Sequence, residues 1–295
     1  MLMATTLMDI LDNYNTEKKC RRLFERIKWY NGIACTRCGS LNLSRHTVRK
    51  IYECMDCWYY FSVTAGTALH RSNLPLRKWV LATYLMCESK KGMSALQVQR
   101  MLDVAPKTAW YLNHRIRFAM SQLPPPKLNG IVEVDETWVG GRNRGRYENP
   151  FENKTLVVGI VERRGDVIVQ VVRKRDRRTL HRFVLSHIDP NVKAIFTDQH
   201  HGYRGLPRHE AVNHSQYEWA RGEVHTNTIE GVWALLKRSI MGAYHHVSPK
   251  YLDLYIEELA WKYNNRHRDK FLLALRELLR DGNYISYEEL TENYK

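Results

Sequence analysis

Three acidic residues occupy positions in this sequence where a carboxylate can take part in chemistry. Asp135 lies inside IVEVDETWVGG (residues 131–141), whose apolar residues and closing Gly-Gly pair predict a buried strand followed by a turn. Asp198 ends the short apolar run KAIFTD, and Glu230 lies near the start of a segment with helical apolar spacing. Burying an unpaired carboxylate costs several kcal/mol, so Asp135 needs a cation, a metal ion or an open cleft. A hydrogen bond between a strand-end acid and a neighbouring loop is the alternative.

Two strand acids and one helix acid, distant in the sequence, can converge at one edge of a sheet and hold a pair of divalent metal ions. Hard oxygen ligands suit Mg2+ or Mn2+, and two such ions can flank a phosphodiester during in-line displacement. Lys237 follows Glu230 by seven residues, close to two helical turns, so both side chains point to the same side. This spacing suggests a cation above a phosphate beside a metal ligand, and an ordinary solvent-exposed lysine is the alternative.

Four segments together resemble the DDE transposases of bacterial insertion sequences, in particular the zinc-ribbon group with an ISXO-like transposase domain, to which Merlin-type transposons are related. The segments are VEVDETWVGG (132–141), TDQHHGY (197–203), HTNTIEGVWALLKR (225–238) and AYHHVSPKYLDLYIEELAWKYNNR (243–266). The resemblance implies an RNase H-like catalytic domain whose first and fourth strands are adjacent. By the same resemblance Asp135, Asp198 and Glu230 are the catalytic acids, and Lys237 is the basic residue that follows them. Some members carry Asn in place of this Glu, and Asn227 lies nearby in this chain.

The resemblance also implies a function, which is DNA transposition. The three acids would bind two Mg2+ or Mn2+ ions, and the protein would hydrolyse phosphodiester bonds at the ends of an insertion sequence and join them to target DNA without a covalent protein–DNA intermediate. Both ends would be held by more than one subunit, so a homo-oligomer on double-stranded DNA is expected. A DNA-binding regulator derived from a transposase is the main alternative, and it would have no use for the three acids. An RNA-cleaving enzyme of the same fold, a recombinase with a serine or tyrosine nucleophile, and a copy that is no longer mobile are further alternatives.

Four of the six cysteines form two Cys-x2-Cys pairs, Cys35 with Cys38 and Cys54 with Cys57. This spacing predicts a zinc ribbon in which four thiolates hold one structural Zn2+. Structural disulfides are the alternative, but nothing in the sequence points to an oxidising compartment. The aromatic run WYYF at residues 58–61 follows the last cysteine and suits either a phosphate-binding surface or the small core of the ribbon.

The positive charge of the chain, formally +15 over 295 residues, is concentrated in its first part. Residues 1–120 contain 19 Lys and Arg against 8 Asp and Glu, whereas residues 121–295 contain 27 against 23. A basic first half indicates a polyanionic partner, most simply nucleic acid, although charge alone does not separate DNA from RNA or from an acidic membrane surface. No apolar run approaches the length of about 20 residues that spans a bilayer, so no membrane association is expected. The expected location is the cytoplasm and nucleoid of a bacterium, or the nucleus of a eukaryote.

Residues 74–120 read as helical, with breaks at Lys90-Lys91-Gly92 and at DVAP (103–106). Helices are predicted at residues 76–89, 95–102 and 107–120, and the short turn before the last one fits a helix-turn-helix. Polar and basic side chains of this last helix would then contact DNA bases and phosphates. They are Lys107, Thr108, Asn113, His114, Arg115 and Arg117. A plain helical bundle with a solvated basic face is the alternative.

The predicted fold is multidomain α+β: a zinc ribbon, a helical helix-turn-helix region and an RNase H-like α/β catalytic domain. A segment rich in Gly and Arg follows the Asp135 strand, and its Arg142, Arg144 and Arg146 are expected to contact DNA. A hairpin (155–162 and 167–172), a helix (177–188) and the KAIFTD strand come next, and a further amphipathic helix is expected at 249–264. The last fifteen residues are acidic and are expected to be peripheral. The domain boundaries expected from these patterns are N-terminal helices at 1–30, the ribbon at 31–66, the helix-turn-helix region at 67–122, a proline linker at 123–128, the catalytic domain at 129–268, and a C-terminal helix with an acidic tail at 269–295.

Overall fold

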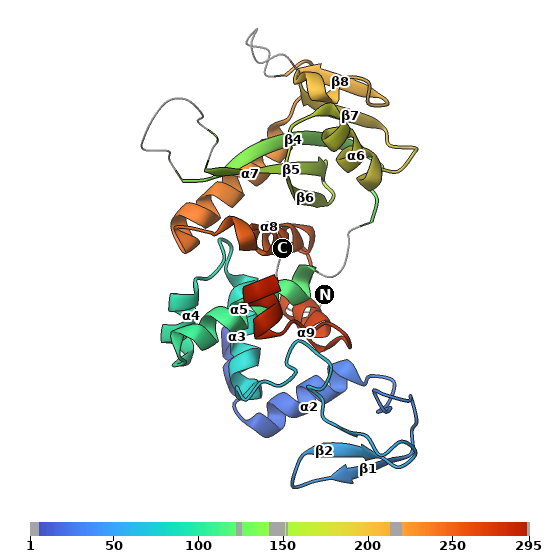
Figure 1. Ribbon diagram of the computed structural model, residues 1–295, viewed down its shortest axis with the longest axis vertical. Coiled ribbons are helices and arrows are strands. Elements are labelled where there is room, and N and C mark those ends of the chain that lie inside the picture. Colours follow the sequence, from blue (N-terminus) through green and yellow to red (C-terminus); the bar gives the residue numbers. More distant parts are fainter. Residues whose placement is uncertain (1–5, 122–125, 142–150, 152, 213–219, 294–295) are drawn as a thin grey trace. The chain divides into compact units, whose positions relative to one another are not determined.

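The computed structural model describes residues 6–121, 126–141, 151, 153–212 and 220–293 of the chain (Figure 1). The chain forms two compact units. Unit 1 comprises Met1–Gln122 together with His267–Tyr294, and unit 2 comprises Leu123–Arg266. Unit 1 is therefore built from both ends of the sequence.

Unit 1 contains most of the helices of the N-terminal half, and several begin where the sequence supplies a cap. Ser94 caps one of them, since its hydroxyl accepts a hydrogen bond from the backbone N–H of Gln97 at 3.2 Å. The predicted helices at 76–89, 95–102 and 107–120 are confirmed to within one residue. The helices of unit 1 are α1 (Leu7–Asn13), α2 (Glu17–Lys28), α3 (Leu76–Glu88), α4 (Ala95–Leu102), α5 (Pro106–Ser121), α9 (Lys270–Leu279) and the π-helical turn η5 (Glu289–Asn293).

The ribbon of unit 1 is a small antiparallel sheet of three strands. They are β1 (Leu43–His46), β2 (Ile51–Cys54) and β3 (Tyr60–Phe61), in the order β1-β2-β3. Its core is aromatic, because Tyr52 and Phe61 stack at 5.7 Å and Trp29 meets both rings edge-on. The WYYF run therefore divides between the two predicted roles: Phe61 is buried, whereas Trp58 and Tyr60 are exposed.

The C-terminal segment completes the core of unit 1. Helix α9 packs against α2, α3 and α5 and buries Phe271, Leu275 and Leu278. The backbone N–H of Ala68 donates to the carbonyl of Leu278 at 2.9 Å, which joins the C-terminal segment to the N-terminal part of unit 1. The expectation that the last fifteen residues are peripheral is wrong, since apolar side chains of this segment reach the interior. Those buried are Ile285, at 5% exposure, and Leu290, at 0%.

Unit 2 is organised around one mixed sheet of five strands with the order β6-β5-β4-β7-β8 (Figure 1). The strands are β4 (Ile131–Gly140), β5 (Lys154–Glu162), β6 (Val167–Val172), β7 (Ala194–Asp198) and β8 (His209–Val212). The first three strands form an antiparallel meander, whereas β7 pairs with β4, and β8 with β7, in parallel. The adjacency of the first and fourth strands of this unit, which the family resemblance implied, is therefore present.

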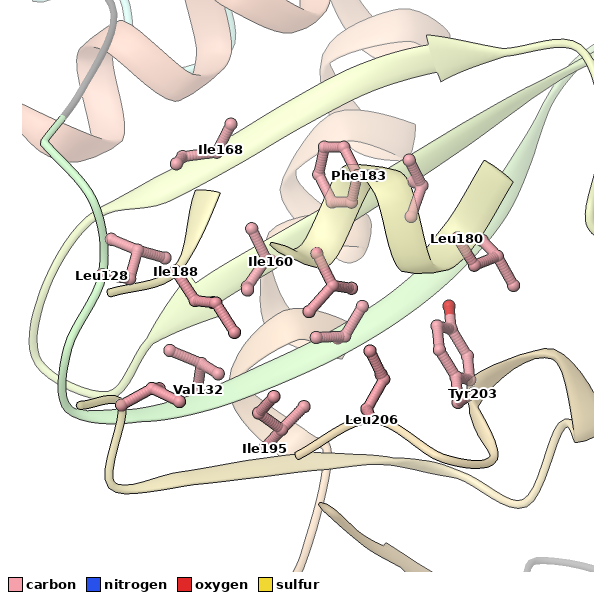
Figure 2. Close-up of a cluster of buried hydrophobic side chains, with 14 residues drawn as sticks. Leu128, Val132, Ile160, Ile168, Leu180, Phe183, Ile188, Ile195, Tyr203 and Leu206 are labelled. Atoms are coloured by element: carbon pink, nitrogen blue, oxygen red, sulfur yellow. The ribbon is translucent and has the colours of Figure 1, made fainter. Parts of the chain in front are cut away.

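Helices cover both faces of the sheet because its strands are apolar on both sides. One face packs against α6 (Arg177–His187), where Val132 and Val134 of β4 meet Leu180 and Phe183. Figure 2 shows this cluster, with Tyr203 of the short 3-10 helix η1 (His201–Tyr203) at one end of it. The other face packs against α7 (Asn227–Ser239) and α8 (Leu252–Asn264). Between these two helices lie the π-helical turn η3 (Ile240–Tyr244) and the 3-10 turn η4 (Pro249–Tyr251). In the described part of the chain, none of the helices combines the length and apolar character needed to cross a bilayer.

Candidate active site

An acidic cluster forms in unit 2 where β7 ends beside the middle of β4. The parallel register pairs Glu133 with Phe196, so two residues later Asp198 is level with Asp135. Carboxylate oxygens of Asp135, Glu136 and Asp198 all lie within 4.8 Å of one another. The structure therefore brings together the two predicted strand acids, and it adds Glu136, which the sequence analysis missed.

Glu136 joins the cluster from the opposite face of β4. Side chains alternate along a strand, so Asp135 points toward α7 and Glu136 points toward α6 and η1. There the Tyr203 hydroxyl donates to Glu136, and Arg175 forms ion pairs with Glu136 and, at 3.7 Å, with Asp198. Burial is the first cause of a raised pKa for the Glu136 carboxyl, and burial likewise raises the pKa of Tyr203 well above its usual value. The sequence signal for Glu136 was its position directly after Asp135 in DETWVGG. Because β7 ends at the level of Asp135, the edge of β4 beyond that point is open, and both acids can reach the cluster.

Asp135 is held on the α7 side by a tryptophan. The indole N–H of Trp233 donates to Asp135 Oδ2 at 3.0 Å. Gly159 of β5 is the residue directly opposite Asp135, and a Cβ atom at Gly159 would lie 2.6 Å from the Trp233 ring. A glycine in this central strand therefore makes the room that the ring needs. Burial, and next the charge of Glu136, raise the pKa of Asp135 to about 7.

A second buried acid, Glu133, fixes the start of α7 on the same face of β4. Its Oε2 accepts hydrogen bonds from the backbone N–H groups of Thr228 at 2.7 Å and Ile229 at 3.1 Å. Its Oε1 accepts from the Thr228 hydroxyl at 2.8 Å and from Arg163 Nε at 2.7 Å, and His225 Nδ1 lies 3.3 Å away. The side chain is fully buried, and a carboxylate at a helix N-terminus satisfies the free N–H groups and the positive end of the helix dipole. The first turn of α7 is therefore capped by a side chain from β4.

Glu230 lies outside the acidic cluster in this structure. It is exposed on the first turn of α7, and its Oε1 accepts a hydrogen bond from the Thr226 hydroxyl at 3.0 Å. Lys237 is exposed near the end of the same helix, two turns further on. Trp233, which touches Asp135, is three residues after Glu230 and is its neighbour on the helix surface.

The four ribbon cysteines form a second candidate metal centre, in unit 1. Their Sγ atoms all lie within 4.8 Å of one another, with Cys35 and Cys57 3.6 Å apart and Cys38 and Cys54 3.5 Å apart. Four thiolates at about 2.3 Å from a tetrahedral Zn2+ would be about 3.8 Å apart, so the set fits that ion. All six cysteines are free, as the zinc interpretation requires.

The structure exposes some of the residues that were expected to contact DNA and buries others. Lys107 is exposed at the start of α5 and Thr108 is half-buried. Four others, however, are at most 3% exposed because α5 packs against α3, α4 and α9: Asn113, His114, Arg115 and Arg117. The guanidinium of Arg115 donates to the carbonyl of His70 at 2.6 Å and lies over the rings of Trp79, Tyr111 and Tyr284. These four side chains are therefore interior in this structure, which corrects their expected display to DNA; Arg142, Arg144 and Arg146 lie outside the described residues.

Comparisons with known proteins match both candidate centres. Residues 127–264 match the family described as the ISXO2-like transposase domain, and residues 15–59 match the transposase zinc-ribbon domain. A curated relative from Halobacterium salinarum, described as an uncharacterized protein in transposable element ISH50, is 27% identical over 251 residues. That alignment covers 77% of this chain and 84% of the relative. The first match contains the whole acidic cluster, and the second contains all four cysteines of the ribbon.

Proposed function

Because this chain belongs to the insertion-sequence transposases, with a transposase zinc ribbon and an ISXO2-like transposase domain, we propose that it cuts and joins DNA at its acidic cluster. The observation that carries the proposal is the meeting of Asp135, Glu136 and Asp198 at the point where β7 ends beside β4. The strand order of unit 2 supports an RNase H-like fold for this domain. Phosphodiester hydrolysis and strand transfer are the reactions that follow for double-stranded DNA.

The donor set of the cluster fits a hard divalent cation. Carboxylate oxygens are the ligands that Mg2+ and Mn2+ prefer, and the cluster supplies them from two adjacent strands. Bound there, Mg2+ or Mn2+ would supply an activated oxygen nucleophile and stabilise the leaving oxygen of an in-line displacement. Asp135 and Asp198 would hold the metal, while the Tyr203 hydroxyl orients the Glu136 carboxylate beside them.

Glu230 is the proposed third acid, and it would join the cluster by rotation of its side chain. Its place three residues before Trp233 puts it one helical turn from the residue that touches Asp135. It is held there by a single side-chain hydrogen bond from the buried Thr226 hydroxyl, and a bond of this kind to a carboxylate is worth about 1.5–3 kcal/mol. Lys237, exposed two turns later, would contact a phosphate of the substrate.

The ribbon and the α4–α5 region are proposed to hold the element ends. One Zn2+ on the four cysteines would stabilise the ribbon. Of the α5 residues expected to contact DNA, Lys107 and Thr108 remain accessible at least in part. A homo-oligomer on DNA, in which more than one subunit holds the two ends, is the expected assembly.

The test is cleavage and joining of end-labelled duplex DNA taken from the borders of the gene's own locus, with Mg2+ or Mn2+. Asp135→Asn, Asp198→Asn and Glu230→Gln should each abolish nicking and joining, whereas the wild type nicks at the boundary and joins that end to other DNA. Glu210→Gln is the matched control, since Glu210 is an exposed acid of β8 in the same unit. Full activity in all three variants would exclude the acid-dependent mechanism, and specific binding without any cutting by the wild type would favour a DNA-binding regulator derived from a transposase.

A further inference from the structure

The segment between β6 and α6 is the most basic short stretch of unit 2. Residues 173–178 read RKRDRR, and all six are exposed. Five positive charges in six positions contrast with the nearly balanced charge of residues 121–295 as a whole. The acidic member, Asp176, is used locally, because its side chain accepts from the backbone N–H of Thr179 and caps α6. The remaining charges have no such role in the helix.

The sheet topology places this β6–α6 segment at the end of the sheet that carries the acidic cluster, where β6 and β7 both terminate. Val172, the last residue of β6, pairs with Leu156 of β5, and Leu156 pairs with Trp138 of β4. The segment therefore leaves the sheet three residues beyond the level of Asp135, at the same end of the sheet where β7 stops at Asp198. The β5–β6 turn and the start of β7 lie at the opposite end of the sheet.

Arg175 connects the segment to the cluster directly. Its guanidinium forms ion pairs with both Glu136 and Asp198, and 38% of its side chain is exposed. It thus bridges carboxylates from two strands, as a metal ion at this cluster would do. Metal ions on the same oxygens would compete with the guanidinium and repel it. Displaced, Arg175 would lie between the cluster and solvent, and its planar fork of N–H donors is suited to a phosphate.

From this geometry we propose that the β6–α6 segment binds the DNA backbone beside the acidic cluster, and that Arg175 exchanges its carboxylate partners for a substrate phosphate when the cluster binds metal ions. The ligand class is the phosphodiester backbone of duplex DNA. A carboxylate cluster repels a phosphate, so cations at its rim are needed to hold the scissile strand close. The inference rests on the proposed function, because it assigns a substrate-binding role at the same site.

The first test measures the salt dependence of DNA binding by the full-length protein, with Ca2+ present to allow binding without cutting. The probe is a labelled duplex from the border of the gene's own locus. Each phosphate contact contributes about 0.9 to the slope of log K against log salt, so Arg173→Gln with Lys174→Gln should lower that slope by about 1 to 2. Phosphate contacts add in this slope, so the change is visible even if unit 1 supplies most of the affinity.

The control is a second double variant with the same loss of charge at the opposite end of the sheet. Arg164, in the β5–β6 turn, and Lys193, just before β7, are both exposed. Arg164→Gln with Lys193→Gln should leave the slope unchanged. Equal slopes for the two double variants, whether both are lowered or both match the wild type, would overturn the proposal.

The second test examines Arg175 through metal binding, without DNA or catalysis. Free Mn2+ is titrated into the wild type, Arg175→Ala and Arg175→Lys, and bound ion is followed by electron paramagnetic resonance. Arg175→Ala should bind Mn2+ several-fold more tightly, because the competing cation is gone, and should lower the salt slope of DNA binding by about 1. Arg175→Lys should fall between the two. Unchanged or weaker Mn2+ binding by Arg175→Ala would contradict the exchange.

The same titration separates failure of this inference from failure of the proposed function. Mn2+ binding that is absent in the wild type, or that survives Asp135→Asn and Asp198→Asn, would remove the metal-dependent active site itself. Mn2+ binding that needs both acids, combined with wild-type salt slopes in the β6–α6 variants, would leave the active site in place and refute only its DNA-binding rim.

Discussion

Replacing Glu133 by Gln is expected to destabilise unit 2 strongly, although it changes one atom in a side chain outside the acidic cluster. Each carboxylate oxygen of Glu133 accepts from two donors: Oε1 from Arg163 and the Thr228 hydroxyl, and Oε2 from the backbone N–H groups of Thr228 and Ile229. An amide has one accepting oxygen and one donating nitrogen. Whichever way the substituted amide turns, its NH2 group faces two donors that it cannot satisfy.

The magnitude follows from burial and charge. Glu133 is 0% exposed and the Arg163 side chain is 19% exposed, so the pair is screened little by solvent. Removing one partner of such a buried pair costs about 3–5 kcal/mol. Two of the four donors that Glu133 accepts from are backbone N–H groups at a helix N-terminus, whose capping alone is worth about 1 kcal/mol and is part of that sum. We therefore expect Glu133→Gln to lower the free energy of unfolding of unit 2 by about 3–5 kcal/mol.

Amide hydrogen exchange resolved on peptides from β4 and β5 is the suitable assay, because a chain with two units need not unfold in one transition. Glu210→Gln is the matched control: Glu210 pairs with Arg221 at 3.6 Å, and both side chains are more than half exposed. An exposed pair of this kind contributes about 0–1 kcal/mol. A loss of less than about 1 kcal/mol in the free energy of unfolding for Glu133→Gln, equal to that of the control, would refute the interpretation that Glu133 fixes the N-terminus of α7.

Three further outcomes are expected. Because the folded-state pKa of Asp135 is raised from 3.8 to about 7, the folded protein holds the extra proton between these values, so unit 2 loses stability as pH rises through this window. Asp135→Asn should therefore stabilise unit 2 more at about pH 8 than at about pH 4 in the same exchange assay, and equal effects would contradict the raised pKa. Gly159→Ala should displace the Trp233 ring from a contact of 2.6 Å and destabilise unit 2 by about 1–3 kcal/mol, whereas Gly231→Ala, with nothing within 4 Å of its added Cβ, should not. Deleting residues 267–295 should expose the core of unit 1 to limited proteolysis and leave β4 and β5 protected, and intact unit 1 after the deletion would contradict the shared core.

Local patterns were sufficient to predict most elements and two members of the acidic cluster. Apolar runs that carry an acid identified β4 and β7, and the breaks at residues 90–92 and 103–106 placed α3, α4 and α5 to within one residue. That Asp135 and Asp198 could meet was a possibility from the pattern, but the adjacency of their strands was expected only through the family resemblance, because strand adjacency is a tertiary property. The cysteine spacing identified the ribbon centre by itself, since ligand spacing is a local property.

The missed residues share a physical reason. Glu136, Arg175 and Tyr203 come from three separate segments, and each looks in the sequence like an ordinary surface or core residue until β7 ends beside β4. The prediction for the polar side chains of α5 was wrong in the opposite sense. Their sequence predicted a DNA-binding face, whereas the neighbouring helices bury them. Arg115 shows why: the neighbours of its guanidinium in the interior are aromatic rings and a backbone carbonyl, none of them charged. Charge in a sequence does not report on such uncharged partners.

The placement of Glu230 follows from what holds α7, and this determines how the third acid can act. The helix is fixed at its first turn by Glu133 and one turn later by Trp233, which fits over Gly159 and reaches Asp135. Glu230 lies between these two anchors, so its backbone has little freedom and only its side chain can reorient. In the proposed metal centre the strand acids would be in place beforehand, whereas Glu230 would be recruited when its attraction to the metal charge exceeds its hydrogen bond to Thr226. A centre completed in this order would keep its third ligand outside the cluster until metal ions were bound.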